Sequence, residues 1–137
     1  MNTQQNIKLS HEQAAFNLFM NESEILHHWQ AIDKTFKRTE QLEANLLERV
    51  KQAVEHPEAN NFSSLGNPSI INNEHKRLSL AKGFALMYAL NPETVKPAHF
   101  RLLNEVFSKT EIAALCAYIC YVYASVQFCQ LIQKRQV

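Results

Sequence analysis

The sequence predicts an all-α protein, and three observations support that prediction. The chain has 137 residues but only two glycines, whereas average usage would supply about nine or ten. Hairpins need glycine-rich tight turns, so this scarcity argues against an all-β fold. No segment alternates between apolar and polar residues for long enough to require a strand, and apolar residues recur at helical spacing instead. The length suits a single domain over residues 1–137.

Capping patterns divide the chain into about six helices. Three pairs have the form of a capping box, in which two side chains three residues apart satisfy free backbone amides: Ser10–Gln13, Asn21–Glu24 and Ser108–Glu111. Proline is favourable at the first position of a helix. Pro92, which follows the capping residue Asn91, and Pro97 therefore each indicate the start of a helical segment. The predicted helices are 10–20, 22–37, 40–55, 73–90, 97–106 and 109–134.

Apolar residues within these segments recur three or four positions apart, which predicts one buried face per helix. The stripes are Ile25, Trp29, Ile32 and Phe36; Leu42, Leu46, Val50 and Val54; Leu78, Phe84, Ala85, Tyr88 and Ala89; and Phe100, Leu103 and Phe107.

Residues 56–72 interrupt the helices with a long irregular segment. It contains Pro57, Gly66, Pro68 and several asparagines, all of which favour turns or break helices. A connection of this length inside a compact domain is unusual, and it is either a surface loop or a functional one.

The last predicted helix, 109–134, is the most apolar part of the chain. From Ile112 to Gln133 it carries no charge, and these residues would extend about 33 Å as a helix, enough to cross a bilayer. Three tyrosine hydroxyls in its middle, those of Tyr118, Tyr121 and Tyr123, would need partners in hydrocarbon, which argues against a span. A core helix covered partly by a second subunit explains it better. We therefore expect a homo-oligomer formed through residues 109–134.

Charge and composition exclude several classes of partner and cofactor. The formal net charge of +1 provides no electrostatic footprint for nucleic acid. No Gly-x-Gly sequence exists to cradle a phosphate, and no cofactor is expected. Three cysteines without a signal-peptide pattern at the start of the chain favour the cytoplasm.

The cysteines and histidines do not form a recognisable metal or redox site. Cys116 and Cys120 share a helix face but lie inside a long apolar helix, where burial keeps a thiol inert. Together with Cys129 they are interpreted as buried structural residues. Glu24 and His27 have the Glu-x-x-His spacing of di-iron bundles, but such sites need two such motifs, and only one is present. No metal site is expected.

Residues 74–132 contain a helix, an Asn-Pro break, a short helix, the run Phe107-Ser-Lys-Thr-Glu-Ile112 and a long apolar helix. This order resembles the C-terminal part of the carboxymuconolactone decarboxylase / alkylhydroperoxidase-D-like (AhpD-like) family. Residues 25–31 and 42–50 look like the family's first two helices. The resemblance implies an all-α AhpD-like helical bundle with a long apolar C-terminal helix, assembled into oligomers.

Peroxidase-type members of that family carry Cys-x-x-Cys-x-x-x-His on a helix where this chain has the segment 56–72, which contains no cysteine. Val126-Gln127 replaces the family's frequent Asn-Arg. Glu48 matches in pattern the family's relay glutamate. The resemblance therefore implies a divergent member without thiol peroxidase activity.

Three functions stay open. The first is a non-catalytic oligomeric helical protein that binds a partner or small molecule. The second is a cysteine-independent, decarboxylase-like enzyme in which Glu48, His56 or His75 would supply acid–base groups. The third is a membrane-associated helical protein using residues 112–133.

Overall fold

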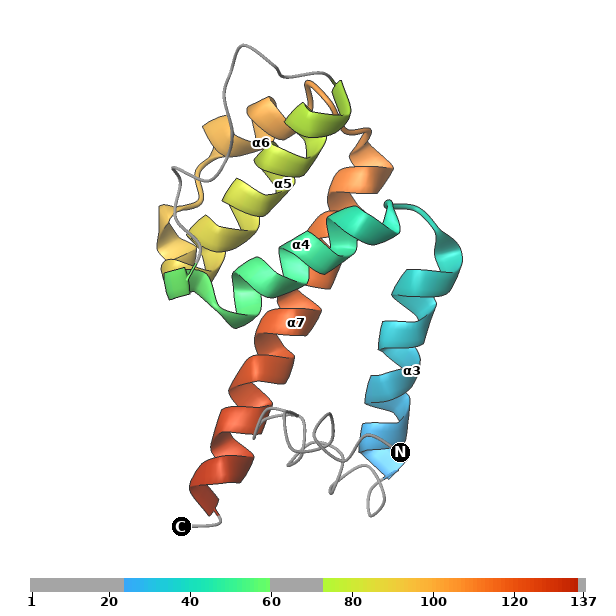
Figure 1. Cartoon of the computed structure of the whole chain (residues 1–137), viewed down its shortest axis with the longest axis vertical. Coiled ribbons are helices and arrows are strands. Elements are labelled where there is room, and N and C mark those ends of the chain that lie inside the picture. The colour runs from blue at the N-terminus through green and yellow to red at the C-terminus, as the bar shows by residue number, and fades with distance from the viewer. Residues whose placement is uncertain (1–23, 60–72, 136–137) are drawn as a thin grey trace, which may run out of the picture. The chain divides into compact units, whose positions relative to one another are not determined.

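The computed structural model describes residues 24–59 and 73–135, and over these residues the secondary structure consists of helices joined by short connections (Figure 1). No strand occurs within the described ranges, which confirms the predicted all-α class. The α-helices are α3 (Glu24–Thr39), α4 (Ala44–Glu55), α5 (Asn73–Leu90), α6 (Pro97–Leu103) and α7 (Lys109–Arg135), with short 3-10 helices η1 (Pro57–Ala59) and η4 (Pro92–Thr94).

Helix boundaries follow the capping signals where local chemistry sets them. Residues 73–90 form a helix as predicted, and α7 ends one residue beyond the predicted limit. The Asn91 side chain accepts a hydrogen bond from the Glu93 amide at 3.1 Å, and Pro97 begins α6. The predicted helix 10–20 lies outside the described residues, as does most of the predicted irregular segment 56–72.

The helix predicted to end at residue 37 extends to Thr39. Two other predicted boundaries are wrong by three or four residues, for identifiable reasons. The helix expected to begin at residue 40 begins at Ala44, because Glu40 adopts a left-handed backbone conformation with φ of 53°. The helix expected to reach residue 106 ends at Leu103. There the chain tightens into hydrogen bonds between residues three apart, from the Glu105 amide to the Leu102 carbonyl and from the Val106 amide to the Leu103 carbonyl.

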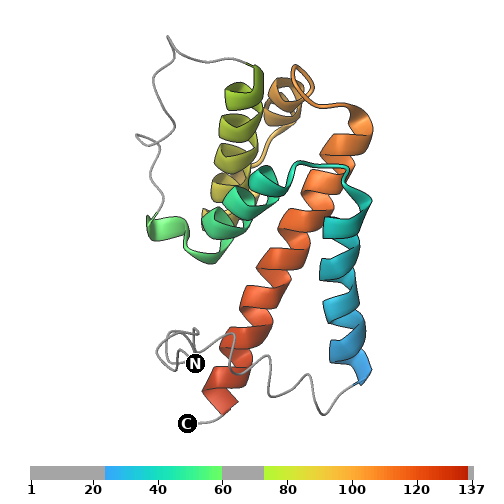
Figure 2. The same cartoon turned by 45° about the vertical axis from the view of Figure 1, so that its right-hand side comes forward.

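The chain divides into two compact units. Unit 2 comprises residues 39–123, and unit 1 comprises residues 1–38 with 124–137. Helix α7 is one continuous helix whose first part belongs to unit 2 and whose last part belongs to unit 1 (Figure 2). The single domain expected from length stays a prediction.

Unit 2 contains a well-formed hydrophobic core. Helix α4 packs along α5, and edge-to-face contacts join Phe84 to Phe100 and Tyr88 to Tyr123, each with ring centroids 5.3 Å apart. The stripe predicted from Leu42 to Val54 is buried throughout. The other buried side chains of this unit include Ala81, Phe84, Ala85, Leu86, Leu103, Phe107, Leu115, Tyr118, Ile119 and Val122.

The described part of unit 1 buries fewer of its apolar side chains. Trp29 of α3 donates a hydrogen bond from Nε1 to Ser125 Oγ at 2.8 Å and stacks on Phe128 at 6.2 Å between ring centroids. None of the described side chains of α3 is fully buried, although its apolar residues form a clear stripe. Ile25 is 73% exposed and Ile32 is 44% exposed. The described part of unit 1 therefore leaves an amphipathic helix incompletely covered.

Candidate functional site

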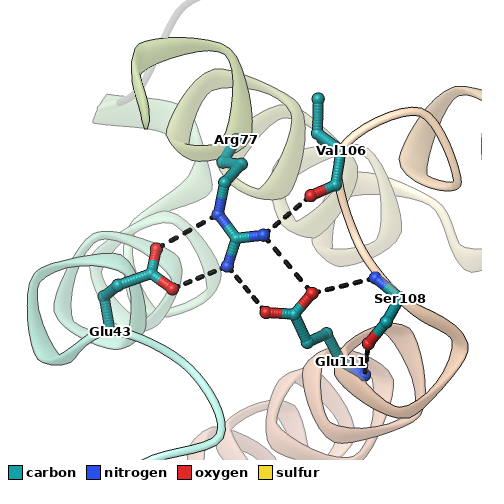
Figure 3. A network of polar contacts seen from close by, with 5 residues as sticks. All are labelled: Glu43, Arg77, Val106, Ser108 and Glu111. Atoms are coloured by element: carbon teal, nitrogen blue, oxygen red, sulfur yellow. Dashed lines mark hydrogen bonds and ion pairs between the residues drawn. The ribbon is translucent and has the colours of Figure 1, made fainter. Parts of the chain in front are cut away.

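The most developed polar cluster of the described residues centres on Arg77, near the start of α5 (Figure 3). Its guanidinium lies between two carboxylates, those of Glu43 just before α4 and Glu111 in the first turn of α7. The Arg77 side chain is 17% exposed, so solvent screens these ion pairs only partly. This arrangement joins three segments that are distant in sequence.

Arg77 uses every donor that it has. Nε and Nη2 donate to the two oxygens of Glu43 at 3.4 and 2.6 Å. Nη1 donates to the Val106 carbonyl at 2.7 Å and to Glu111 Oε1 at 3.4 Å, while Nη2 also donates to Glu111 Oε2 at 2.9 Å. A guanidinium has five N–H groups, and these five hydrogen bonds account for all of them. No donor is left for an anionic ligand, so the cluster is structural.

Glu111 links Arg77 to the start of α7 through the predicted capping box. The Ser108 amide donates to Glu111 Oε1 at 2.8 Å, and the Glu111 amide donates to Ser108 Oγ at 3.1 Å. This exchange satisfies two backbone amides that the helix itself cannot. The Arg77 guanidinium also lies 4.4 Å above the ring of buried Phe107, which adds a cation–π contact.

The electrostatics of the cluster follow from these contacts. The hydrogen bond to Glu111, opposed by partial desolvation and reinforced by Glu43, raises the pKa of Arg77 further above its ordinary value. Hydrogen bonds from Arg77 and from the Ser108 amide lower the pKa of Glu111 below its ordinary value of 4.5. The pKa shifts of Arg77 and Glu111 therefore both favour the charged forms of these two groups at neutral pH.

The lowered pKa of Glu111 predicts an acid-dependent loss of stability. A carboxylate with a depressed folded-state pKa contributes stability above its unfolded value, and that contribution is lost as pH falls through the folded-state pKa. As the pH is lowered beyond about 4.5, we expect the free energy of unfolding of the wild type to decrease. We expect a smaller decrease in Glu111→Gln. Urea titrations at a series of pH values measure it.

Glu105→Gln is the control for that titration, because it removes a half-exposed carboxylate that only Lys76 contacts among the described residues. We expect it to retain the wild-type acid dependence. An identical acid dependence in Glu111→Gln and the wild type would contradict the role assigned to Glu111.

The three acid–base candidates lie outside this cluster. Glu48 is exposed on α4 and accepts a hydrogen bond from Gln52 at 3.4 Å. His56 is exposed at the end of α4, where its amide donates to the Gln52 carbonyl, and His75 is exposed in the first turn of α5. The structure therefore places all three candidates at exposed positions.

Two further points concern metal-binding residues and the sequence signals for Arg77. No group of three or more His, Cys, Asp or Glu side chains within the described residues could hold a metal ion. Arg77 itself was not among the candidate residues, because its partners lie 29 to 34 positions away and no local motif connects them. Only the Ser108–Glu111 capping box gave a signal at this site.

Comparisons of the chain with protein-family models, with curated proteins and with solved structures found no significant match. The class of protein is defined by the fold and the Arg77 cluster. It is an all-α protein in which the best-connected polar cluster of the described residues holds helices together.

Proposed function

We propose that this chain is a divergent AhpD-like, cytoplasmic helical protein that self-associates through its C-terminal helix and has no thiol peroxidase activity. The AhpD-like assignment rests on the resemblance of residues 74–132. The observation that carries the proposal of self-association is the incomplete burial of apolar side chains in unit 1.

Helix α7 supports self-association through its composition and its partial burial. Lys109–Lys134 contains an 18-residue stretch apolar enough to cross a membrane, yet only a third of that stretch is buried. The first part of α7 supplies Leu115, Tyr118 and Ile119 to the core of unit 2. The last part, in unit 1, leaves Leu131 66% exposed. A second copy packed on this part of α7 would cover that side chain.

A buried polar atom in the same part of α7 also supports a missing partner. Gln133 Nε2 is buried and has no hydrogen-bond partner among the described residues. An amide donor buried without an acceptor costs about 1–3 kcal/mol, which an acceptor from a further segment or chain would relieve.

The same helix favours a membrane-associated protein as the second candidate, because Lys109–Lys134 is long and apolar enough to cross a bilayer. A span of about 20 residues would have to withdraw Leu115, Tyr118 and Ile119 from the core of unit 2. Residues 124–134 alone are too short to span. We therefore expect carbonate extraction to release the protein from membranes, whereas retention in the membrane pellet would favour the second candidate.

The cysteines support the absence of thiol peroxidase activity. The thiolate is the reactive form, and a reactive cysteine has a lowered pKa. Burial, and then the neighbouring Cys120, raise the pKa of Cys116 instead. Burial, followed by the same neighbour, also raises the pKa of Tyr88. This surrounding therefore disfavours an anion at Cys116. Cys129 is buried as predicted and Cys116 is half-buried, but Cys120 is exposed, so its interpretation as a buried residue is wrong.

A hydroperoxide assay tests that part of the proposal. With an alkyl hydroperoxide and a dithiol reductant, we expect the wild type to consume peroxide no faster than a variant in which Cys116, Cys120 and Cys129 are all serine. Turnover by the wild type that the triple variant loses would contradict the proposal.

A further inference from the structure

The exposed flank of α3 is the surface on which a partner is best defined. Ile25 and Ile32 lie one heptad apart on it, and the exposed side chains of His28 and Thr35 lie between and after them. This alternation of three and four residues is the spacing of a helix that pairs with another helix. Trp29, on the neighbouring flank, is occupied by Ser125 and Phe128 of its own unit.

The charges of α3 indicate what that partner is. Its first turn carries Glu24, and its last turn carries Lys37 and Arg38. Two α3 helices in parallel would place like charges beside each other at both ends, which is unfavourable. Two α3 helices in antiparallel orientation would place the acidic end of each beside the basic end of the other.

One antiparallel register pairs the opposite charges and keeps Ile25 and Ile32 within the seam. When Ile25 lies opposite Thr35 of a second copy, and His28 opposite Ile32, heptad geometry places Glu24 beside Arg38. Both of these charged side chains are exposed. Glu24 lies 3.9 Å from His28 Nε2 in its own helix, and both of these side chains are largely exposed. In the same register Ala31 meets its own copy at the two-fold axis, where a small side chain permits close approach.

We propose that a second copy of this chain packs on α3 in this antiparallel register, with Glu24 of each copy paired to Arg38 of the other. The inference rests on the proposed self-association. It adds α3 to the C-terminal helix as a second surface on which copies meet, and it names the orientation of the two α3 helices. The interface is isologous, so each substitution acts twice, once at each end of the helix pair.

Reciprocal charge reversals in the full-length chain test the register. Glu24→Arg places arginine opposite Arg38, and Arg38→Glu places glutamate opposite Glu24. We expect each single variant to weaken self-association at least about tenfold in sedimentation equilibrium at low salt. In an equimolar mixture of the two variants, one α3 carries arginine at positions 24 and 38 and the other carries glutamate at both. We expect this mixture to recover the wild-type mass as a heterodimer.

Lys34→Glu is the matched control. It makes the same change of charge as Arg38→Glu at another exposed position of α3, on the side away from the proposed seam. We expect its mass to equal that of the wild type, and far-UV circular dichroism to show unchanged helix content in all variants.

The outcomes separate this inference from the proposed function. A monomeric wild type would overturn both. An associating wild type, with single variants that keep its mass, would overturn only the inference and would indicate that another surface, or residues 1–23 of the same chain, covers this flank. Single variants that dissociate but fail to recover in the mixture would overturn the antiparallel register.

Discussion

Replacing Arg77 with methionine is expected to lower the free energy of unfolding by about 2–3 kcal/mol. Methionine keeps the apolar length of the side chain but removes all five hydrogen bonds. It leaves the Val106 carbonyl and the partly buried Glu111 carboxylate, which is 27% exposed, without their strongest partner. The cation–π contact with Phe107 is lost as well. Urea denaturation at neutral pH and one fixed protein concentration measures the effect.

The neighbouring residue supplies a matched control for this substitution. Lys76 also pairs with a glutamate, since its Nζ lies 3.1 Å from Glu105, but these two side chains are 43% and 51% exposed. Exposed pairs contribute about 0–1 kcal/mol, so Lys76→Met should be close to neutral. Equal losses in Lys76→Met and Arg77→Met would contradict the special role of the Arg77 cluster.

Truncating Leu115 to alanine is expected to lower the free energy of unfolding by about 2–5 kcal/mol. Leu115 is fully buried, and it lies on the face of α7 that supplies Tyr118 and Ile119 to the core of unit 2. The substitution removes apolar contacts and leaves a cavity that the surrounding helices can only partly close. The same denaturation experiment measures the loss.

Leu102→Ala is the control for that truncation, because it deletes the same atoms from a side chain that is 46% exposed. We expect it to cost less than about 1 kcal/mol. A small effect of Leu115→Ala would mean that the first part of α7 is not a core helix, and it would strengthen the membrane alternative.

The elements best predicted from the sequence are those whose ends are set by local chemistry. The Ser108–Glu111 capping box and Pro97 each mark the start of a helix correctly, because their hydrogen bonds and backbone angles involve only neighbouring residues. The stripe from Leu42 to Val54 was also sufficient to identify the face of α4 that is buried.

Features that depend on distant residues could not be predicted in this way. Glycine or asparagine at position 40 would have indicated a left-handed conformation, but the residue there is Glu40. The predicted start of α4 is therefore wrong. The stripe containing Ile25 and Ile32 predicts a buried face, yet within the described residues that face is largely uncovered. Its spacing defines an apolar face but cannot specify what covers it.

The candidate site illustrates the same limit. Residue type favours Glu48, His56 and His75 as candidates, and the family pattern adds to the case for Glu48, yet each of the three is exposed in the structure. Arg77 was not selected, because an arginine near a helix start has no distinctive local pattern. Its importance arises only when folding brings Glu43, Val106 and Glu111 around it.

The most direct test of self-association is the mass of the unmodified chain in solution. Sedimentation equilibrium over a range of micromolar concentrations should give a mass that is a multiple of 15.8 kDa and should show dissociation only on dilution. A constant mass of 15.8 kDa over the whole range would contradict it.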